Sequence, residues 1–273
     1  VNAVIPPLAV RGPCITIRKF ARAPLQMSDL VSMGSLSEPM AVFLSRCVRA
    51  KKNLVISGGT GSGKTTLLNV LSGEISSEER IITIEDAAEL RLAQPHVVSL
   101  ESRPNNLEGQ GAYTIRDLVK NALRMRPDRI VVGECRAGEA IDMLQAMNTG
   151  HEGSMTTTHA NSVGESIKRI ETLCLMSGLD LPTRAIREQI AASIHVVVQQ
   201  SRFSDGSRRV TSIAEIRGLD EHGEIVVSEI FTFARAGTGG DGRVHGTHRR
   251  TGYVPSFLGD FIRRGLVDEG GYL

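Results

Sequence analysis

A glycine-rich run between an apolar strand pattern and a helix pattern constrains this chain more than any other feature. The run Gly58–Thr65 fits G-x-x-x-x-G-K-[ST]; Asn53–Ser57 precedes it as an apolar strand and Thr66–Leu71 follows as a helix. Glycines let such a loop curl so that backbone N–H groups point inward, and the helix adds the positive end of its dipole. Strand, loop and helix in this order predict a site for the phosphates of a nucleoside triphosphate.

Within this loop, two side chains have a specific expected role. Lys64 is expected to reach the β- and γ-phosphates, and Thr65 to place its hydroxyl on Mg²⁺. The residues expected to bind the nucleotide are Gly58, Gly59, Thr60, Gly61, Ser62, Gly63, Lys64, Thr65 and Thr66.

Strand and helix patterns alternate from residue 51 onward. Apolar strand patterns occur at 54–57, 80–84, 97–100, 129–133, 154–158 and 195–199, with helix patterns between them. The alternation predicts an α/β fold with a mostly parallel sheet covered by helices. One helical pattern is expected from about 28 to 50.

Carboxylates follow two of these strand patterns. Glu85 and Glu89 come at the end of the first, and Glu134 directly follows Ile130–Gly133. Because ligands bind at the carboxyl ends of parallel strands, we expect these acids to face the phosphate loop. The aspartate usual at such a strand end is absent, so Glu134 is expected to hold Mg²⁺ through water and to polarise the nucleophile, with Glu85 a further metal candidate. The alternative is surface acids that cap strands.

Histidines and arginines complete the candidates. His151 and His159 flank a strand of about eight residues, which separates them by roughly 25 Å and excludes a shared metal. His159, at the carboxyl end, is the better candidate for a γ-phosphate sensor. A positive charge placed beside the γ-phosphate speeds phosphoryl transfer, so some basic residues are possible fingers or sensors, although any one arginine is more often a solvated charge than a catalytic finger. They are Arg11, Arg18, Arg124, Arg136 and His151.

Composition limits the class of protein. The 273 residues carry a net charge of +2, so bulk charge does not argue for nucleic-acid binding. No apolar run approaches the roughly 20 residues that span a bilayer. The four cysteines are scattered, which argues against zinc and disulfides and fits a reducing cytosol. Because the first residue is Val1, we expect the chain to be a fragment.

Three regions are expected along the chain. Residues 1–24 read as the remnant of an upstream domain and its linker, 25–200 as the core, and 201–273 as a β-rich appendage. Within the appendage, a meander of hairpins precedes a Gly- and Arg-rich segment, 234–252, expected to be a flexible loop, and a terminal helix that opens near Pro255. Contact of 234–252 with a nucleic acid or an acidic lipid surface is the alternative to a solvated linker.

Four motifs in this order resemble those of the ATPases of type II secretion, type IV secretion and type IV pili. They resemble the Walker A loop at 58–65, the Asp box at 83–90, the Walker B strand at 130–134 and the His box at 150–161. The resemblance extends over about 1–233. Thr83–Asp86, Arg126–Asp128, Gly133–Arg136 and Thr156–Asn161 look most similar to the CpaF-type branch, which serves tight-adherence (Flp) pili.

This resemblance implies a RecA-like P-loop core and a homo-hexameric ring that hydrolyses ATP with Mg²⁺. It also implies coupling to an inner-membrane platform protein, and therefore a cytoplasmic protein peripherally associated with that membrane. By analogy, Glu134 and Glu89 are the catalytic acids, His159 is the sensor, and Arg11 and Arg18 approach the phosphates. The tetracysteine zinc module that related extension motors often carry is missing here.

Two other functions are compatible with the sequence. A conjugation ATPase or nucleic-acid translocase has local support only from Arg243, Arg249 and Arg250, so a nucleic-acid partner is not favoured. A slowly hydrolysing nucleotide switch is the third candidate.

Overall fold

The computed structural model describes residues 1–17, 24–106 and 108–268. Its helices are α1 (Met27–Ser32), α2 (Glu38–Arg49), α3 (Lys64–Ser72), α4 (Ile115–Ala122), α5 (Glu139–Asn148), α6 (Val163–Leu175), α7 (Thr183–Ser193) and α8 (Leu258–Arg263). Its strands are β1 (Asn2–Val4), β2 (Cys14–Thr16), β3 (Leu54–Gly58), β4 (Ile81–Glu85), β5 (Val97–Glu101), β6 (Arg129–Val132), β7 (Met155–Thr158), β8 (Val196–Arg202), β9 (Arg208–Leu219), β10 (Ile225–Thr238) and β11 (Val244–Arg250).

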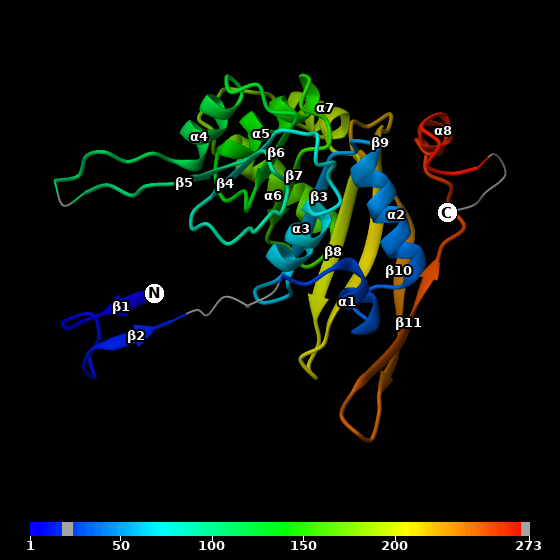
Figure 1. Cartoon of the computed structure of the whole chain (residues 1–273), viewed down its shortest axis with the longest axis horizontal. Helices are drawn as coiled ribbons and strands as arrows, with labels where there is room; N and C mark the ends of the chain where they lie inside the picture. The colour runs from blue at the N-terminus through cyan, green and yellow to red at the C-terminus, as the bar shows by residue number, and fades with distance from the viewer. Residues whose placement is uncertain (18–23, 107, 269–273) are drawn as a thin grey trace.

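One nine-stranded sheet organises most of the chain, in the order β11-β10-β9-β8-β3-β7-β6-β4-β5 (Figure 1). Neighbours from β8 to β5 are parallel. Neighbours from β8 to β11 are antiparallel. The predicted α/β fold with a mostly parallel sheet is confirmed, and the C-terminal strands extend this same sheet.

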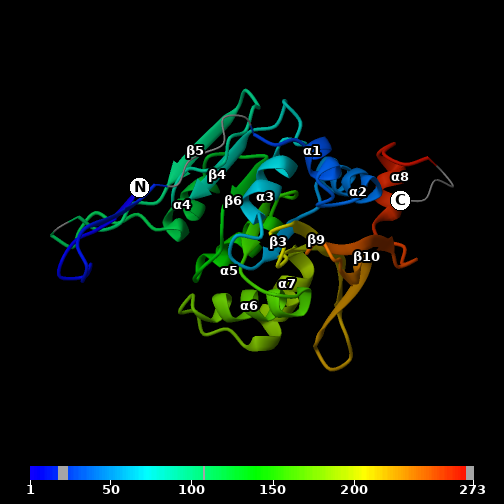
Figure 2. The same cartoon turned by 90° about the horizontal axis from the view of Figure 1, so that it is seen from below.

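Helices cover both faces of the sheet (Figure 2). Leu54 and Ile56 point into a core shared with α1, α2, α3 and α8. Val55, between them, points into the opposite core, shared with α4 to α7. Strands buried on both faces read as continuous apolar runs, which is why the parallel strands were visible in the sequence.

The C-terminal helix is joined to α2 by aromatic packing. The Phe43 ring lies 6.3 Å from that of Phe257 and 6.2 Å from that of Phe261, between ring centroids. Beside them the buried Glu215 carboxylate accepts hydrogen bonds from Tyr253 Oη, at 2.9 Å, and from Ser256. The end of the described chain is therefore packed onto the core.

Two expectations about individual elements differ from the structure. The helix expected from 28 to 50 is divided into α1 and α2, and Gly34 between them has a φ of +67°, a left-handed conformation that interrupts a helix. The flexible loop expected for 234–252 is instead the end of β10 and the whole of β11. Phe233 packs against His248, with ring centroids 5.0 Å apart, and this cross-strand pair stabilises the hairpin.

The first described segment, 1–17, forms a small hairpin of β1 and β2 that lies apart from the large sheet (Figure 1). Large apolar side chains on it are exposed, with Val1 and Val10 both 92% accessible. In the part of the chain that the structure describes, no helix has both the length and the apolar character needed to cross a membrane.

Candidate nucleotide-binding site

The predicted motifs meet at one edge of the sheet. Because β3, β4, β6 and β7 are parallel, the segments that follow them emerge side by side. These segments are the glycine-rich loop after β3, the acidic segment 85–90, Glu134 after β6 and His159 after β7. Residues far apart in the sequence thus form one site.

The glycine-rich loop adopts a backbone that side chains would prevent. Gly61 and Gly63 have φ values of +72° and +100°, and Gly63 caps the N-terminus of α3. A Cβ atom on Gly58 would overlap the backbone carbonyl of Gln200. With α3 starting at Lys64, free N–H groups and the positive end of the helix dipole face the loop, as an anion site requires.

Lys64 lies inside this loop and is buried. Its Nζ donates to the carbonyl oxygens of Gly58, at 2.9 Å, and Gly59, at 3.2 Å. Burial lowers the pKa of Lys64, and the Arg136 charge lowers it further, while Glu134 opposes both. The ammonium is therefore held in the loop by neutral carbonyls, which a phosphate oxygen can replace.

Glu134, His159 and Lys64 form one connected network. His159 Nδ1 lies 2.6 Å from Glu134 Oε1, and because a carboxylate only accepts, this nitrogen carries the proton. The other nitrogen, Nε2, lies 3.3 Å from Lys64 Nζ and 3.1 Å from Thr60 Oγ1, and it accepts from these donors in a neutral ring. The histidine thus connects the acid after β6 to the phosphate loop.

Arg136 holds the opposite side of Glu134. Its Nη2 donates to Glu134 Oε2 at 2.8 Å and its Nη1 to Asp86 Oδ2 at 2.9 Å. Burial raises the pKa of Glu134, but the hydrogen bonds donated by Arg136 and His159, together with the charge of Arg136, lower it to a net value below its usual range. Glu134 is therefore a carboxylate at neutral pH.

The acidic segment after β4 is shaped by Glu85. This buried carboxylate accepts from the backbone N–H groups of Glu89 and Leu90, both at 3.0 Å, and burial raises its pKa. A Cβ on Gly133 would lie 2.9 Å from Glu85 Cγ, which explains why glycine precedes Glu134. Glu85 thus holds the turn that carries the half-buried Glu89.

Several predicted residues are not brought to this edge. Arg124 is exposed in the turn before β6, and His151 precedes β7, so both lie at the opposite edge of the sheet. His151 Nδ1 lies 2.9 Å from the Pro127 carbonyl oxygen, a contact that joins two turns. Arg11 lies in the separate β1–β2 hairpin, and Arg18 is outside the described residues.

Residues of the β8–β9 hairpin lie against the loop, although no sequence motif indicates a role for them. Arg208 Nε donates to the Gly61 carbonyl oxygen at 2.8 Å. A Cβ on Gly61 would lie 3.4 Å from Arg202 Nη1, and one on Gly63 would lie 3.2 Å from the Gln200 amide nitrogen. The signal for these residues was the Asp205-Gly206 turn between two strand patterns, but local patterns do not show that β8 pairs with β3.

The donor atoms near Lys64 suit a hard cation. Thr65, on the first turn of α3, offers a hydroxyl, and Glu134 offers a carboxylate, the oxygen ligands that Mg²⁺ prefers. Among residues 1–17, 24–106 and 108–268, no group of three or more His, Cys, Asp and Glu side chains is arranged to hold a metal ion.

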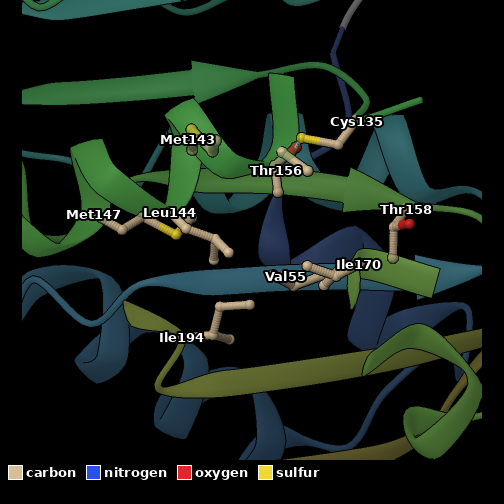
Figure 3. A pocket seen from close by; sticks show the side chains of 10 residues that line it. Val55, Cys135, Met143, Leu144, Met147, Thr156, Thr158, Ile170 and Ile194 are labelled. Atoms are coloured by element: carbon tan, nitrogen blue, oxygen red, sulfur yellow. Dashed lines mark hydrogen bonds between the residues drawn. The ribbon is translucent and has the colours of Figure 1, made fainter. Parts of the chain in front are cut away.

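A small cavity lies between α5 and the strands β3 and β7 (Figure 3). It holds only about 10 Å³ and is lined mainly by apolar side chains of α5, including Met143 and Met147, while β7 contributes Thr156 and Thr158. Burial raises the pKa of Cys135, on its wall, to about 12, so this thiol is a packing group rather than a nucleophile. The cavity has room for about one water molecule and is no nucleotide site.

Fold and site together define a P-loop protein with a RecA-like core, as predicted. Residues 3–228 match the family model described as "Type II/IV secretion system protein", and the chain belongs to this family.

Three relatives place the chain within this family. It is 44% identical over 216 residues to a putative conjugal transfer protein of Mycobacterium tuberculosis strain H37Rv, covering 79% of this chain and 61% of that protein. It is 39% identical over 236 residues to the type IV secretion system protein PtlH of Bordetella pertussis, covering 77% and 69%. The crystal structure of the VirB11 ATPase from the Brucella suis type IV secretion system, in complex with sulphate, superposes with a TM-score of 0.59 at 31% identity, covering 73% and 60%.

Proposed function

We propose that this chain is the nucleotide-hydrolysing part of an ATP-driven motor in a bacterial secretion or pilus-assembly machine. The observation that carries this proposal is the network of Lys64, His159 and Glu134 at the edge of the phosphate loop. It links a phosphate-binding cation to a carboxylate that can orient water. Family membership and the ATPase title of the VirB11 structure support it.

In this proposal, each residue of the network has a separate task. The loop N–H groups and Lys64 bind the phosphates, and Lys64 exchanges the Gly58 and Gly59 carbonyls for phosphate oxygens. Glu134 accepts a hydrogen bond from the attacking water and orients it. Glu89 assists from the neighbouring acidic segment, and His159 senses the γ-phosphate through the nitrogen that faces Lys64.

Mg²⁺ fits this site as a cofactor. Thr65 and, through water, Glu134 would hold it, and when bound it supplies charge neutralisation at the β- and γ-phosphates. We assign Glu85 to the acidic turn rather than to the metal, because its carboxylate accepts from two backbone N–H groups.

We further propose a homo-hexameric ring that acts on an inner-membrane platform protein from the cytoplasmic side. The chain spans 61% of the length of the M. tuberculosis relative, so the complete protein's partners belong to this proposal. Within the family, the wording of the four motifs favours the tight-adherence (Flp) pilus branch. Arg11 and Arg18 belong to the segment expected to approach the phosphates in such an assembly, and Arg124 and His151 to surfaces open to a neighbour.

A second candidate is a DNA-conjugation ATPase. The relatives named as conjugal transfer proteins favour it, as do the exposed arginines Arg243, Arg249 and Arg250 on the β10–β11 hairpin. Stimulation of hydrolysis by duplex DNA, with a steep loss as salt is raised, would support this reading over the pilus motor.

The test is ATP hydrolysis by paired variants. Lys64→Ala should abolish turnover, because the γ-phosphate loses its cation, and Glu134→Gln should bind ATP but lose at least about 100-fold in kcat. The exposed Lys168→Ala and Glu78→Gln are matched controls that should retain full turnover. Near-wild-type hydrolysis by Lys64→Ala would refute the proposal.

A further inference from the structure

Two arginines of the β8–β9 hairpin lie over the phosphate loop. Arg208 is fixed there by its 2.8 Å bond to the Gly61 carbonyl oxygen. Arg202 pairs with Arg208 across the hairpin, and its guanidinium approaches Gly61. Both side chains are exposed to solvent on the side that faces away from the loop.

These two guanidinium groups are available to a ligand. Asp205 is the acid within the hairpin, and its oxygens accept from Ser207 and from the backbone N–H of Val244, which lowers the pKa of Asp205 to about 2. In the described part of the chain, neither Arg202 nor Arg208 forms an ion pair with a carboxylate. Arg208 uses only its Nε on the loop, so the outer edge and the planar face of its guanidinium remain open.

The strand order fixes which part of a nucleotide would reach them. β7 and β8 flank β3 on opposite sides, so His159 and Glu134 lie on one side of the loop and the hairpin arginines on the other. Lys64 faces His159, and the lysine of such a loop binds the β- and γ-phosphates. A triphosphate whose terminal end lies by Lys64 therefore extends its nucleoside end toward β8 and β9.

Buried polar atoms without partners point to the same side. Gln200 is 3% exposed, and its Oε1 has no hydrogen-bond partner among the described residues. Ser62, in the loop opposite it, is 1% exposed, and its Oγ likewise lacks a partner within the described chain. Buried polar atoms are nearly always bonded, so these two atoms are available to bond a water molecule or a ligand group on this side of the loop.

We propose that Arg202 and Arg208 bind the ribose and base of the nucleotide, with Arg208 also holding the loop through Gly61. The planar guanidinium groups stack on the base and donate to the ribose hydroxyls. Stacking tolerates any base, so these residues distinguish a nucleotide from inorganic phosphates rather than one base from another. The inference rests on the proposed function, since it assumes that the loop binds a nucleotide.

The test compares ligands with and without a nucleoside. The double variant Arg202→Lys/Arg208→Lys keeps both charges but loses both planar groups. By isothermal titration calorimetry, we expect the Kd for ATP and for ADP to rise about tenfold, while the Kd for inorganic tripolyphosphate changes less than twofold. Arg243→Lys, an exposed arginine on the β10–β11 hairpin, is the matched control and should change neither.

Each outcome decides the inference. Equal weakening of ATP binding and tripolyphosphate binding would assign the arginines to the loop or to the phosphates. Unchanged ATP affinity would show that the arginines do not contact the nucleotide. Either result overturns the inference, while the proposed function stands. If the wild-type chain binds neither ATP nor tripolyphosphate, the proposed function itself fails. The single variants Arg202→Lys and Arg208→Lys repeat the comparison if the double variant has a lowered Tm.

Discussion

At the scale of single residues, the charge balance around Glu134 determines what its carboxylate can do. Arg136 is largely exposed, yet it connects Glu134 to Asp86, which in turn accepts from Ser102 Oγ at 3.0 Å. The arginine is thus held on both sides, and its charge offsets the burial of Glu134. The carboxylate stays ionised at neutral pH and below, as a group that orients water requires.

Removing Arg136 should therefore change the pH dependence of hydrolysis. Activity needs ionised Glu134, and a lowered pKa keeps the carboxylate ionised to a lower pH. In Arg136→Ala the burial of Glu134 is no longer offset by the arginine, so its pKa rises and the acid limb of the kcat–pH profile should move to higher pH. Steady-state kinetics across the acid range measures this limb.

Arg136→Lys is the control for this experiment. It keeps a positive charge beside Glu134 and should leave the limb closer to that of the wild type. An acid limb that stays in place in Arg136→Ala, with turnover still measurable, would show that Glu134 is not the group that titrates.

At the scale of elements, a buried ion pair joins several segments of the chain at the edge of the sheet opposite the nucleotide-binding site. Arg129 is fully buried on β6 and donates to Glu79, at 2.7 Å, and to the carbonyl oxygens of Val48 and Gly153. It thus connects α2, β6 and the turns before β4 and β7. A Cβ on Gly153 would overlap the guanidinium, so this turn needs glycine.

Loss of Glu79 should destabilise the fold more than the loss of a surface acid. Glu79→Ala leaves the Arg129 charge buried without its partner, and we expect the free energy of unfolding to fall by about 3 kcal/mol. The neighbouring exposed Glu78→Ala should change it by less than about 0.5 kcal/mol. Urea unfolding followed by circular dichroism measures both; similar values for the two variants would contradict a structural role for the pair.

The same elements show how far local patterns predict the structure. For most ends of the parallel strands, the predicted boundary lies within one or two residues of the observed one. The reason is that strands buried on both faces must be apolar throughout. The end of β10 and the whole of β11 were missed because these strands are stabilised by partners distant in the sequence. Arg209 lies 5.0 Å from the centre of the Phe233 ring, and Phe233 packs against His248. An arginine-rich segment therefore folds as strand where it was expected to be loop.

At the scale of the whole molecule, strand order decides which residues meet. The convergence of the glycine-rich loop, Glu134 and His159 followed from parallel strands alone, since their carboxyl ends share an edge. The position of Arg202 and Arg208 beside the loop could not be predicted in this way. It depends on β8 lying beside β3, and local periodicity does not show which strands are neighbours. Arg124 and His151 lie at the opposite edge of the sheet, and sequence proximity to a strand does not tell which edge of the sheet a turn occupies.

The position of the first segment leads to a prediction about assembly. The β1–β2 hairpin, whose connection carries Arg11, lies apart from the large sheet (Figure 1). Under the proposed ring, some basic groups that stabilise charge on the γ-phosphate come from a neighbouring subunit, which a lone chain lacks.

Specific ATPase activity should then rise about tenfold or more as protein concentration increases, and level off where light scattering shows that an oligomer has formed. Lys64→Ala gives the background rate at each concentration. Substantial activity that stays flat across a range in which the chain remains monomeric would mean that one chain completes its own site, and would favour the nucleotide switch over the ring motor.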